Sequence, residues 1–232
     1  SGYTSSELMR FLVTHPAEVK VELMTSETYT GQRVDRVLPN LRGFIKLEFE
    51  KLELDQLKGR VDVVVLAVPH KVAMSYAPQI LDQGIRVIDF SADYRLKDPE
   101  VYQRWYHVEH TSPEWLTRAV YGLPERYRER IRTAELIANP GCYPTGAILA
   151  AMPLLDKGLV ELDSIIIDAK SGISGAGSKP QESTHFPNRD SNVVAYNIGV
   201  HRHTPEIEQE LSHIAGEMVR VPLKVSAPPQ TQ

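Results

Sequence analysis

The sequence of 232 residues contains one cysteine, Cys142, which excludes an intrachain disulfide and a zinc site built from several cysteines. No apolar run approaches the roughly 20 residues that a membrane-spanning helix needs, and no signal peptide is recognisable. The net charge is −4, and no basic run carries interleaved aromatic residues. We therefore expect a cytoplasmic protein that uses neither a membrane nor a nucleic acid as its partner.

The composition that remains is that of an ordinary globular protein. Hydrophobic residues make up 42% of the chain and charged residues 24%, and no internal repeat or low-complexity tract is present. A chain of this length can form two modest domains or one large one.

The first part of the chain shows the pattern of an open parallel sheet. Residues 61–68 form a nearly continuous β-branched run, which is typical of a strand buried on both faces. A helical stretch over 71–82 and a short apolar strand over 85–90 follow, and this order implies a right-handed parallel crossover. Residues 1–90 therefore predict most of an open α/β nucleotide-binding fold. Other expected elements are helices at 5–14 (capped by Thr4) and 205–216, and strands at 19–24, 46–54, 135–138 and 164–169.

The stretch from Asn139 to Gly146 surrounds the single cysteine with turn-forming residues. Pro144 suits the first position of a helix, because its missing N–H would have no partner there. Cys142 would then lie just before a helix N-terminus, where free N–H groups and the helix dipole favour a thiolate. Cys142 is therefore a candidate nucleophile, and the alternative is a buried, inert cysteine.

Several small residues could contact a dinucleotide. The opening glycine turn runs straight into a helix, as in sites that hold a pyrophosphate on helix N–H groups. Other candidates follow strands whose carboxyl ends should meet at one sheet edge, or lie in a loop of glycines and hydroxyl residues. The candidate cofactor-binding residues are Ser1, Gly2, Tyr3, Thr4, Ser26, Ala67, Pro69, Ser91, Ser171 and Gly172.

Three histidines are candidates for acid/base chemistry. A thiol needs a base and a leaving group needs an acid, and an imidazole serves both near neutral pH. His201 and His203 alternate about Arg202 on an extended piece, and Glu206 opens the next helix, so this group could bind an anionic substrate. His185 could join the two histidines in a zinc site, but no regular ligand spacing supports a metal.

Two blocks of the sequence, Asn139–Gly146 and Val200–Gln209, resemble the N-acetyl-gamma-glutamyl-phosphate reductase family of the semialdehyde dehydrogenase superfamily. The opening turn and the segments 91–96 and 171–177 resemble other blocks of that family, in the expected order. The resemblance implies an α/β protein with a Rossmann-type parallel-sheet domain over 1–138. It implies an α/β catalytic domain of the semialdehyde and glyceraldehyde-phosphate dehydrogenase type over 139–232.

The same resemblance implies an enzyme of arginine biosynthesis that uses NADPH to reduce an acyl phosphate. It assigns the nucleophile to Cys142 and the acid/base role to His201. By position in the motifs, it places Arg202, His203, Glu206 and Asn139 at the substrate. We expect no metal and expect a homo-oligomer, either a dimer or a tetramer.

Two features depart from the family pattern. The strand that should precede the opening turn is absent, and the chain stops just after a strand-like piece at 225–230, so we expect that both ends lack sequence. Glu27 lies after the second strand, where the family often carries a basic residue and where an acidic side chain usually favours NAD. We still expect NADP, with Ser26 contacting the 2′-phosphate and Arg33 folding back as the cation.

Three alternatives remain open on the sequence. The first is a related reductase that acts on aspartyl phosphate or on a carrier-bound aminoadipyl phosphate. The second is a Cys-His acyl hydrolase, which would leave the opening glycine turn unexplained. The third is a nucleotide-sensing protein that has lost activity, and the presence of both Cys142 and His201 argues against it.

Overall fold

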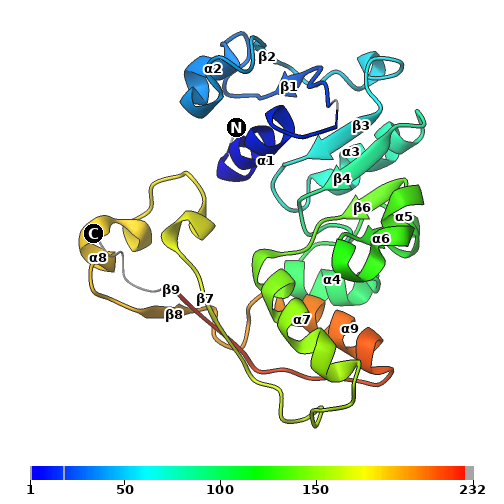
Figure 1. The fold of residues 1–232 in the computed structure, drawn as a ribbon, viewed down its shortest axis with the longest axis vertical. Coiled ribbons are helices and arrows are strands. Elements are labelled where there is room, and N and C mark those ends of the chain that lie inside the picture. The colour runs from blue at the N-terminus through cyan, green and yellow to red at the C-terminus, as the bar shows by residue number, and fades with distance from the viewer. Residues whose placement is uncertain (1, 18, 228–232) are drawn as a thin grey trace. The chain divides into compact units, whose positions relative to one another are not determined.

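The computed structural model describes residues 2–17 and 19–227, drawn as a ribbon in Figure 1. Ser1, predicted at the cofactor, lies outside the described residues. The chain divides into two compact units. The N-terminal unit comprises Ser1–Asp62 with Ala176–Lys179, and the C-terminal unit comprises Val63–Gly175 with Pro180–Gln232.

The N-terminal unit is built on a short parallel pair of strands, in which Met24 is opposite Phe49. Its core gathers apolar side chains, among them Met9, Val34 and Leu41, which are nearly inaccessible to solvent. Its elements are α1 (Tyr3–Val13), β1 (Met24–Thr25), α2 (Val34–Val37), β2 (Phe49–Glu50) and the 3₁₀ turns Pro39–Leu41 and Leu54–Gln56.

Three expectations for this unit need correction. Thr4 does not cap the first helix, because α1 already begins at Tyr3 and Gly2 is its N-cap. The strands expected at 19–24 and 46–54 shrink to β1 and β2, two residues each. Alternating apolar residues mark where a strand is possible, but only pairing with a neighbour decides how far it extends.

The C-terminal unit contains the parallel sheet that the β-branched run predicted, but the strand from this run is not buried on both faces, because Val63 is 43% exposed. Its strands lie in the order β3-β4-β6-β5, and every neighbouring pair is parallel. They are β3 (Val63–Leu66), β4 (Arg86–Asp89), β6 (Leu136–Ala138) and β5 (Val120–Tyr121). The helices of this part are α3 (Ala73–Leu81), α4 (Pro99–Tyr106), α5 (Glu114–Arg118) and α6 (Pro124–Thr133).

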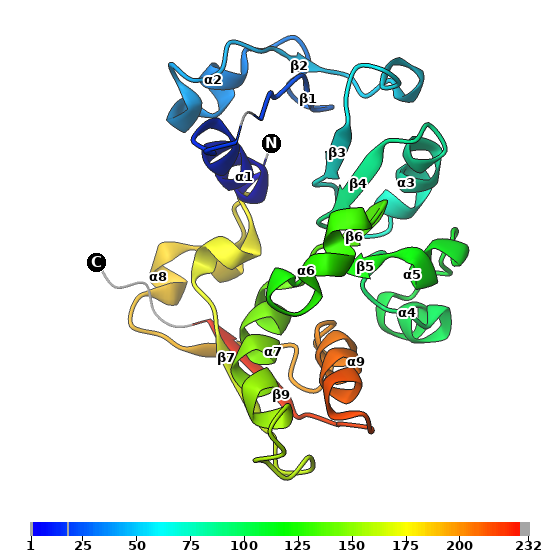
Figure 2. The same cartoon turned by 45° about the vertical axis from the view of Figure 1, so that its right-hand side comes forward.

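A second sheet of the same unit packs against two long helices. In it β9 pairs in parallel with β7 and antiparallel with β8. Figures 1 and 2 show α7 (Cys142–Leu155) and α9 (Thr204–Ala215) side by side. The remaining elements are β7 (Ile167–Lys170), β8 (Val194–Tyr196), β9 (Leu223–Ala227), α8 (Phe186–Arg189) and the 3₁₀ turns Ile173–Ala176 and Glu182–Thr184.

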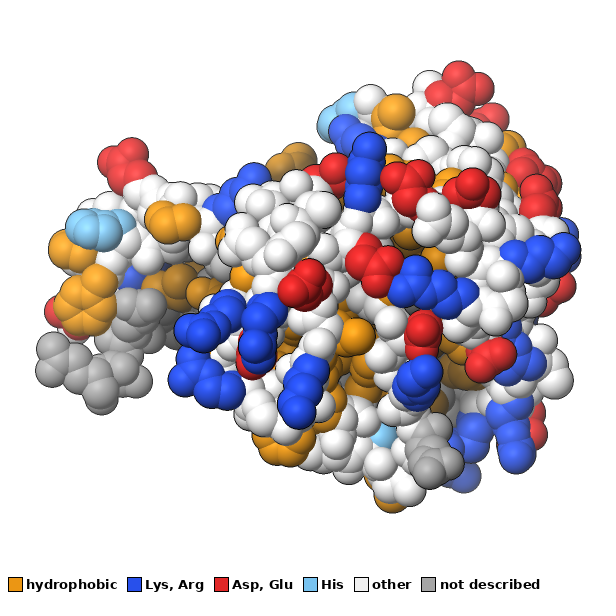
Figure 3. All heavy atoms as spheres, turned by 90° about the horizontal axis from the view of Figure 1, so that it is seen from above, with side chains coloured by type: hydrophobic (Ala, Val, Ile, Leu, Met, Phe, Trp, Pro, Cys, Tyr) orange, Lys and Arg blue, Asp and Glu red, His pale blue; other side chains and the backbone are white. Residues whose placement is uncertain are grey.

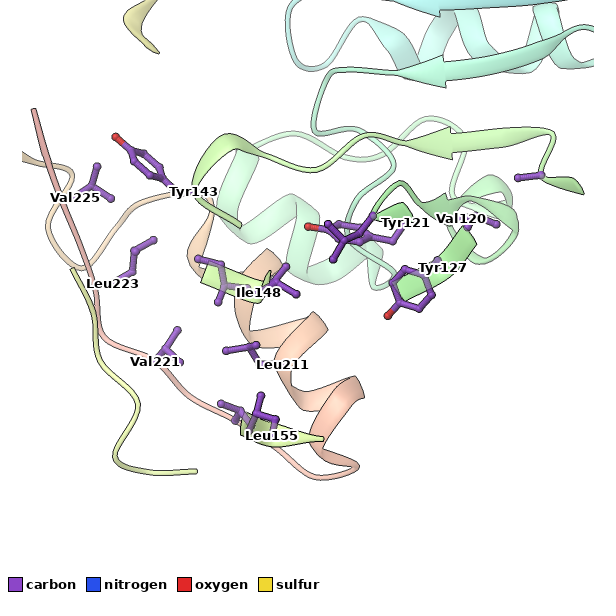
Figure 4. Close-up of a cluster of buried hydrophobic side chains, with 14 residues drawn as sticks. Val120, Tyr121, Tyr127, Tyr143, Ile148, Leu155, Leu211, Val221, Leu223 and Val225 are labelled. Carbon is purple, nitrogen blue, oxygen red and sulfur yellow. The ribbon is translucent and has the colours of Figure 1, made fainter. Parts of the chain in front are cut away.

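The core between these helices and β9 is shown in Figure 4. Ile148 of α7 and Leu211 of α9 are completely buried, as is Val225 of β9. Burying side chains of this size stabilises a fold by about 1.5–3 kcal/mol each. This core therefore fixes the helix that begins with Cys142 against the helix that follows His203.

The strand expected at 164–169 begins later, at Ile167, and Ile166 remains 76% exposed.

On the face seen in Figure 3, acidic and basic side chains are largely interspersed. Within the described residues, no helix has both the length and the apolar character needed to cross a membrane.

Candidate active site

Cys142 is the first residue of α7, and its side chain is exposed and unpaired. Expected just before the helix, it instead lies within the first turn, while Pro144 is the third helical residue. Gly141 is the N-cap in an extended conformation (φ −65°, ψ 157°), and its carbonyl accepts the first helical bond from Thr145 N at 3.0 Å. A thiol in this position meets the positive end of the helix dipole, which favours an anion.

The turn before Cys142 stands at the carboxyl edge of the parallel sheet. Asn139 follows β6 directly, and its backbone N–H donates to the carbonyl of Asp89 at the end of β4, at 2.8 Å. Ligands of open α/β sheets bind at this edge. The cysteine therefore occupies the place in the fold where a substrate is expected.

A buried carboxylate holds the turn in place. Glu206 is 1% exposed, and its Oε1 accepts hydrogen bonds from the backbone N–H of Gly141 and the hydroxyl of Tyr121, both at 2.8 Å. Its Oε2 pairs with Arg95 Nη1 at 3.4 Å. Expected at the substrate, Glu206 instead has its carboxylate committed inside the protein.

Arg95 ties the same turn to the sheet. Its Nε donates to the carbonyl of Asn139 at 2.8 Å, and its Nη2 donates to the carbonyl of Phe90 at 3.0 Å. Because Arg95 is itself 5% exposed, these bonds form where water does not compete with them. The sequence patterns did not identify Arg95 or Tyr121 as residues of the site, although Arg95 lies in the segment 91–96 that resembles a block of the family.

The imidazole of His203 lies directly against the cysteine turn. A side-chain carbon added to Gly141 would come within 2.5 Å of His203 Nε2, so only glycine leaves room for the ring. Burial, and then the charge of Arg95, lower the pKa of His203 to about 3. Its Nδ1 is buried and has no hydrogen-bond partner among the described residues. His203 is therefore a neutral ring packed on the backbone beside Cys142.

His201 lies next to His203, with ring centroids 4.8 Å apart, and is 8% exposed. The rings of Tyr143 and Tyr196 meet it edge-on at centroid distances of 5.4 and 5.8 Å. Burial, and then the charge of Arg202, lower the pKa of His201. Tyr143 follows Cys142 directly, so this contact brings the ring of His201 to the start of α7.

Arg202 is exposed and lies over the ring of Tyr106 in α4, with its Cζ 5.4 Å from the centroid. Tyr106 stacks on Tyr102 at 4.7 Å and meets His70 at 5.8 Å. A guanidinium held over an aromatic face keeps its charge and its donors available. Arg202 is therefore available to bind an anion beside the site.

His185 lies apart from the other two histidines that were considered for a metal site. His185 is exposed at the N-cap of α8. Among the described residues, no hydrogen bond or ring contact joins it to His201 or His203. Across residues 2–17 and 19–227, no group of three His, Cys, Asp or Glu side chains is placed to hold a metal ion.

The predicted cofactor-binding residues fall in both units. Gly2, Tyr3 and Thr4 open α1 and are exposed, and Ser26 follows β1, where its Oγ accepts from Tyr29 N at 3.2 Å. Arg33, expected to fold back as a cation, is instead bound to Asp35 through Nε and Nη2, at 3.0 and 2.7 Å.

In the C-terminal unit, Ala67 and Pro69 are exposed after β3. Ser91, by contrast, is 1% exposed, and its hydroxyl donates to Asp89 Oδ2 at 2.8 Å. Ser171 and Gly172 follow β7, and the Ser171 hydroxyl donates to the carbonyl of Gly172 at 2.9 Å. The hydroxyl of Ser91 is therefore not presented to a ligand.

Known proteins match this chain along nearly all its length. The family model described as "Semialdehyde dehydrogenase, NAD binding domain" matches residues 1–134, and that described as "Semialdehyde dehydrogenase, dimerisation domain" matches 142–231. The N-acetyl-gamma-glutamyl-phosphate reductase of Desulforudis audaxviator is 49% identical over 221 residues, which are 95% of this chain and 64% of that protein. The [LysW]-L-2-aminoadipate/[LysW]-L-glutamate phosphate reductase of Sulfurisphaera tokodaii is 48% identical over 223 residues, 96% of this chain and 64% of that protein.

A solved structure shares the fold. Aspartate semialdehyde dehydrogenase II from Vibrio cholerae superposes with a TM-score of 0.70 at 16% identity, covering 99% of this chain and 68% of that one. The expected α/β class, with a Rossmann-type domain and a catalytic domain of the semialdehyde dehydrogenase type, is thereby confirmed. The chain spans a little under two thirds of the curated relatives named above, and it belongs to the semialdehyde dehydrogenase family.

Proposed function

We propose that this protein reduces N-acetyl-gamma-glutamyl phosphate to N-acetylglutamate semialdehyde and phosphate with NADPH, as a step of arginine biosynthesis. The observation that carries the proposal is an exposed thiol in the first turn of α7, whose neighbours Gly141 and Tyr143 contact the partly buried ring of His203 and the buried ring of His201. The 49% identity to a reductase with this name supports the choice of substrate.

Cys142 is the proposed nucleophile. Its thiolate attacks the carbonyl carbon of the acyl phosphate, the carbon–oxygen bond to phosphate breaks, and a thioester remains on the sulfur. A thioester accepts hydride more readily than a carboxylate does, so covalent catalysis divides one difficult step into two easier ones. When the C–S bond then breaks, its electron pair returns to Cys142 and the aldehyde leaves.

The other site residues bind or position the substrate. The exposed guanidinium of Arg202 is the proposed partner of an anionic group of the substrate, and Asn139, which follows β6 at the start of the cysteine turn, is a second proposed contact. His203 and Glu206 shape the turn from behind, through the contact with Gly141 and the hydrogen bond to its N–H. His201 is the proposed hydrogen-bonding partner of the oxygen of the reacting carbonyl.

The opening of α1 fits the pyrophosphate of a dinucleotide. In the described chain, no side chain caps this helix, its first turn has no acidic residue, and a carbon added to Gly2 would meet no other atom within 4 Å. Gly2, Tyr3 and Thr4 can therefore present free N–H groups to a phosphate. The nicotinamide, when bound, would supply the hydride that reduces the thioester.

The test is phosphate-dependent oxidation of N-acetylglutamate semialdehyde, followed by the absorbance of reduced nicotinamide. We expect turnover by the wild type and none by Cys142→Ala. Aspartate semialdehyde and a carrier-bound aminoadipate semialdehyde are the competing substrates, and the 48% identity to a LysW-type reductase makes the second the stronger alternative. Faster turnover of either competitor would reassign the substrate.

We propose that NADP is preferred over NAD. Ser26 still has a hydroxyl proton to donate to a 2′-phosphate, and Glu27 is exposed, so its carboxylate can remain in solvent. The ratio of kcat/KM with NADP to that with NAD should exceed one in the wild type. It should fall in Ser26→Asp, because the new negative charge repels the phosphate. An NAD preference, or a ratio unchanged by the substitution, would favour Glu27 as a ligand of the ribose.

We further propose a cytoplasmic homo-oligomer, a dimer or tetramer, in which the dinucleotide-binding domain ends at residue 138. The match to a dimerisation domain from residue 142 supports both the assembly and the boundary. Light scattering during size-exclusion chromatography distinguishes a monomer from either assembly.

A further inference from the structure

We propose that His201 acts as a neutral imidazole that carries its proton on Nε2 and donates a hydrogen bond to the substrate oxygen. It does not form a thiolate–imidazolium pair with Cys142. The inference rests on the function proposed above and specifies the protonation of its central histidine. The hydrogen bond to Nδ1 carries it.

The backbone fixes the tautomer. His201 Nδ1 accepts a hydrogen bond from the backbone N–H of His203 at 3.2 Å. A ring nitrogen that accepts such a bond cannot carry a proton, so the neutral ring must hold its proton on Nε2. Protonation of Nδ1 would break this bond and turn two N–H groups toward each other. The imidazolium form is therefore disfavoured by local geometry.

The surroundings of the ring also oppose a positive charge. Tyr143 of α7 and Tyr196 of β8 meet its edges, and His203 and Arg202 adjoin it on its own segment. Arg202 is positive, and burial and this charge together lower the pKa of His201. Within the described residues, no carboxylate makes a hydrogen bond or an ion pair with the ring.

The carboxylate closest in sequence is Glu206, and it is already engaged. Its two oxygens accept from Gly141, Tyr121 and Arg95. Within the described residues, an imidazolium at position 201 would therefore have no carboxylate as a hydrogen-bonded or ion-pair partner. Since Cys142 is exposed, water and the dipole of α7 can stabilise its thiolate without His201.

Two more histidines of the same unit repeat this arrangement. His70 Nδ1 accepts from Ala92 N at 2.9 Å, and His110 Nδ1 accepts from Ser112 N at 3.2 Å. For His110 the other nitrogen, Nε2, lies 2.7 Å from the carbonyl of Asp93, which requires the proton on Nε2. The positive charges that act on His203 from Arg95 and Arg202 therefore come from guanidinium groups and not from these rings.

A neutral donor is sufficient for the chemistry. Thiolate attack places an electron pair on the carbonyl oxygen, and loss of phosphate returns it. Hydride addition to the thioester makes the oxyanion again, and departure of the thiolate restores the carbonyl. No step requires a proton on that oxygen, so a fixed Nε2–H that stabilises the oxyanion accelerates both halves. Removing one such donor lowers kcat by roughly 10²–10³-fold.

Nuclear magnetic resonance of ¹⁵N-histidine-labelled protein tests the tautomer without substrate or cofactor. The signals of His201 are assigned by their loss in His201→Asn, and exposed His107 provides the internal reference. From about pH 5 to about pH 8, the range in which an ordinary imidazole changes charge, we expect a protonated Nε2 and an unprotonated Nδ1. A doubly protonated ring, or a proton on Nδ1, in this range overturns the proposal.

Alkylation of Cys142 by iodoacetamide gives an independent measurement. Without an ion pair, the pH midpoint of alkylation in His201→Gln should stay close to that of the wild type. If His201 were an imidazolium partner, its loss would raise the midpoint by about 1–3 units, the usual effect of removing a nearby opposite charge. Neither measurement uses turnover, so an inactive protein could still confirm the tautomer, and an active one could still contradict it.

Discussion

At the scale of single residues, Glu206 shows how a side chain suggested by a motif can act through the backbone. Its position in the block 200–209 suggested contact with substrate. The structure instead buries it with Arg95, at side-chain exposures of 2% and 6%, and connects it to the N–H of Gly141. The position of Cys142 thus depends on a carboxylate that faces away from solvent.

We predict that Glu206→Gln destabilises the protein by about 3–5 kcal/mol, the usual effect of leaving a buried charge without its partner. The unfolding free energy from urea titrations measures this loss. Glu135→Gln is the matched control, because Glu135 pairs with Arg118 at the exposed surface, where a pair contributes at most about 1 kcal/mol. Equal losses in the two variants would contradict the role given to Glu206.

Asp89 is a second residue whose environment can be measured. It ends β4 and is completely buried, and burial raises the pKa of its carboxyl from 3.8 to about 7, against the opposing effect of hydrogen bonds from Ser91. The folded protein therefore binds a proton here that the unfolded chain releases above about pH 4. Its contribution to stability is complete at low pH and is lost as the pH rises toward 7.

We predict that the unfolding free energy of Asp89→Asn, minus that of the wild type, increases as the pH rises from about 4 to about 7. The total change is at most roughly 4 kcal/mol, and the difference is constant above pH 7. Urea titrations at several pH values measure this slope, whatever the offset between the two proteins. A difference that does not vary with pH would show that Asp89 ionises normally.

At the scale of elements, the site depends on how α7 and α9 are held together. Ile148 and Leu211 lie in one buried cluster between the two helices (Figure 4). The cluster fixes the start of α7, with Cys142, relative to the start of α9, which follows His203 directly. The ring of His203 then fills the space beside Gly141.

We predict that Gly141→Ala lowers kcat by about 10²-fold, because the new methyl group displaces the ring of His203 and with it the cysteine turn. The backbone of Gly141 is compatible with alanine, so the effect comes from this contact alone. Gly146→Ala, a few residues along α7 with open space around it, is the control and should raise stability by about 0.5–1 kcal/mol. If both variants keep full activity, the ring contact does not position the nucleophile.

The elements that sequence predicts well are those with strong local patterns. The run 61–68 contains β3, and the helix expected from 205 to 216 agrees closely with α9. Strands that depend on pairing were shortened or missed: β1 has two residues where six were expected, and β5 and β8 were not predicted. A short strand is decided by its neighbours in space, which a local pattern does not contain.

The residues of the candidate site also separate into those that the sequence predicts and those that it does not. Cys142 and His201 stand out because reactive residue types occur there in recognisable motifs. Arg95, Tyr121 and Tyr106 could not be placed from the sequence, because their contacts join segments far apart in the chain. Ser91 was expected to contact the cofactor, but it is buried and its hydroxyl donates a hydrogen bond to Asp89.

At the scale of the whole molecule, family membership and site geometry support the same chemistry. The two semialdehyde dehydrogenase matches cover both halves of the chain, and the turn that carries Cys142 falls where one match ends and the other begins. The proposal therefore requires that hydride transfer occur on a substrate already attached to this cysteine. That covalent attachment is the central claim.

Intact-protein mass spectrometry tests this claim most directly. The protein is mixed with N-acetyl-gamma-glutamyl phosphate in the absence of nicotinamide, quenched in acid, and digested to locate any added mass. The account predicts one acyl group on the peptide that contains Cys142, which disappears when NADPH is added and never forms in Cys142→Ala. Reduction of the substrate by Cys142→Ala at the wild-type rate, or an acyl group on another residue, would contradict it.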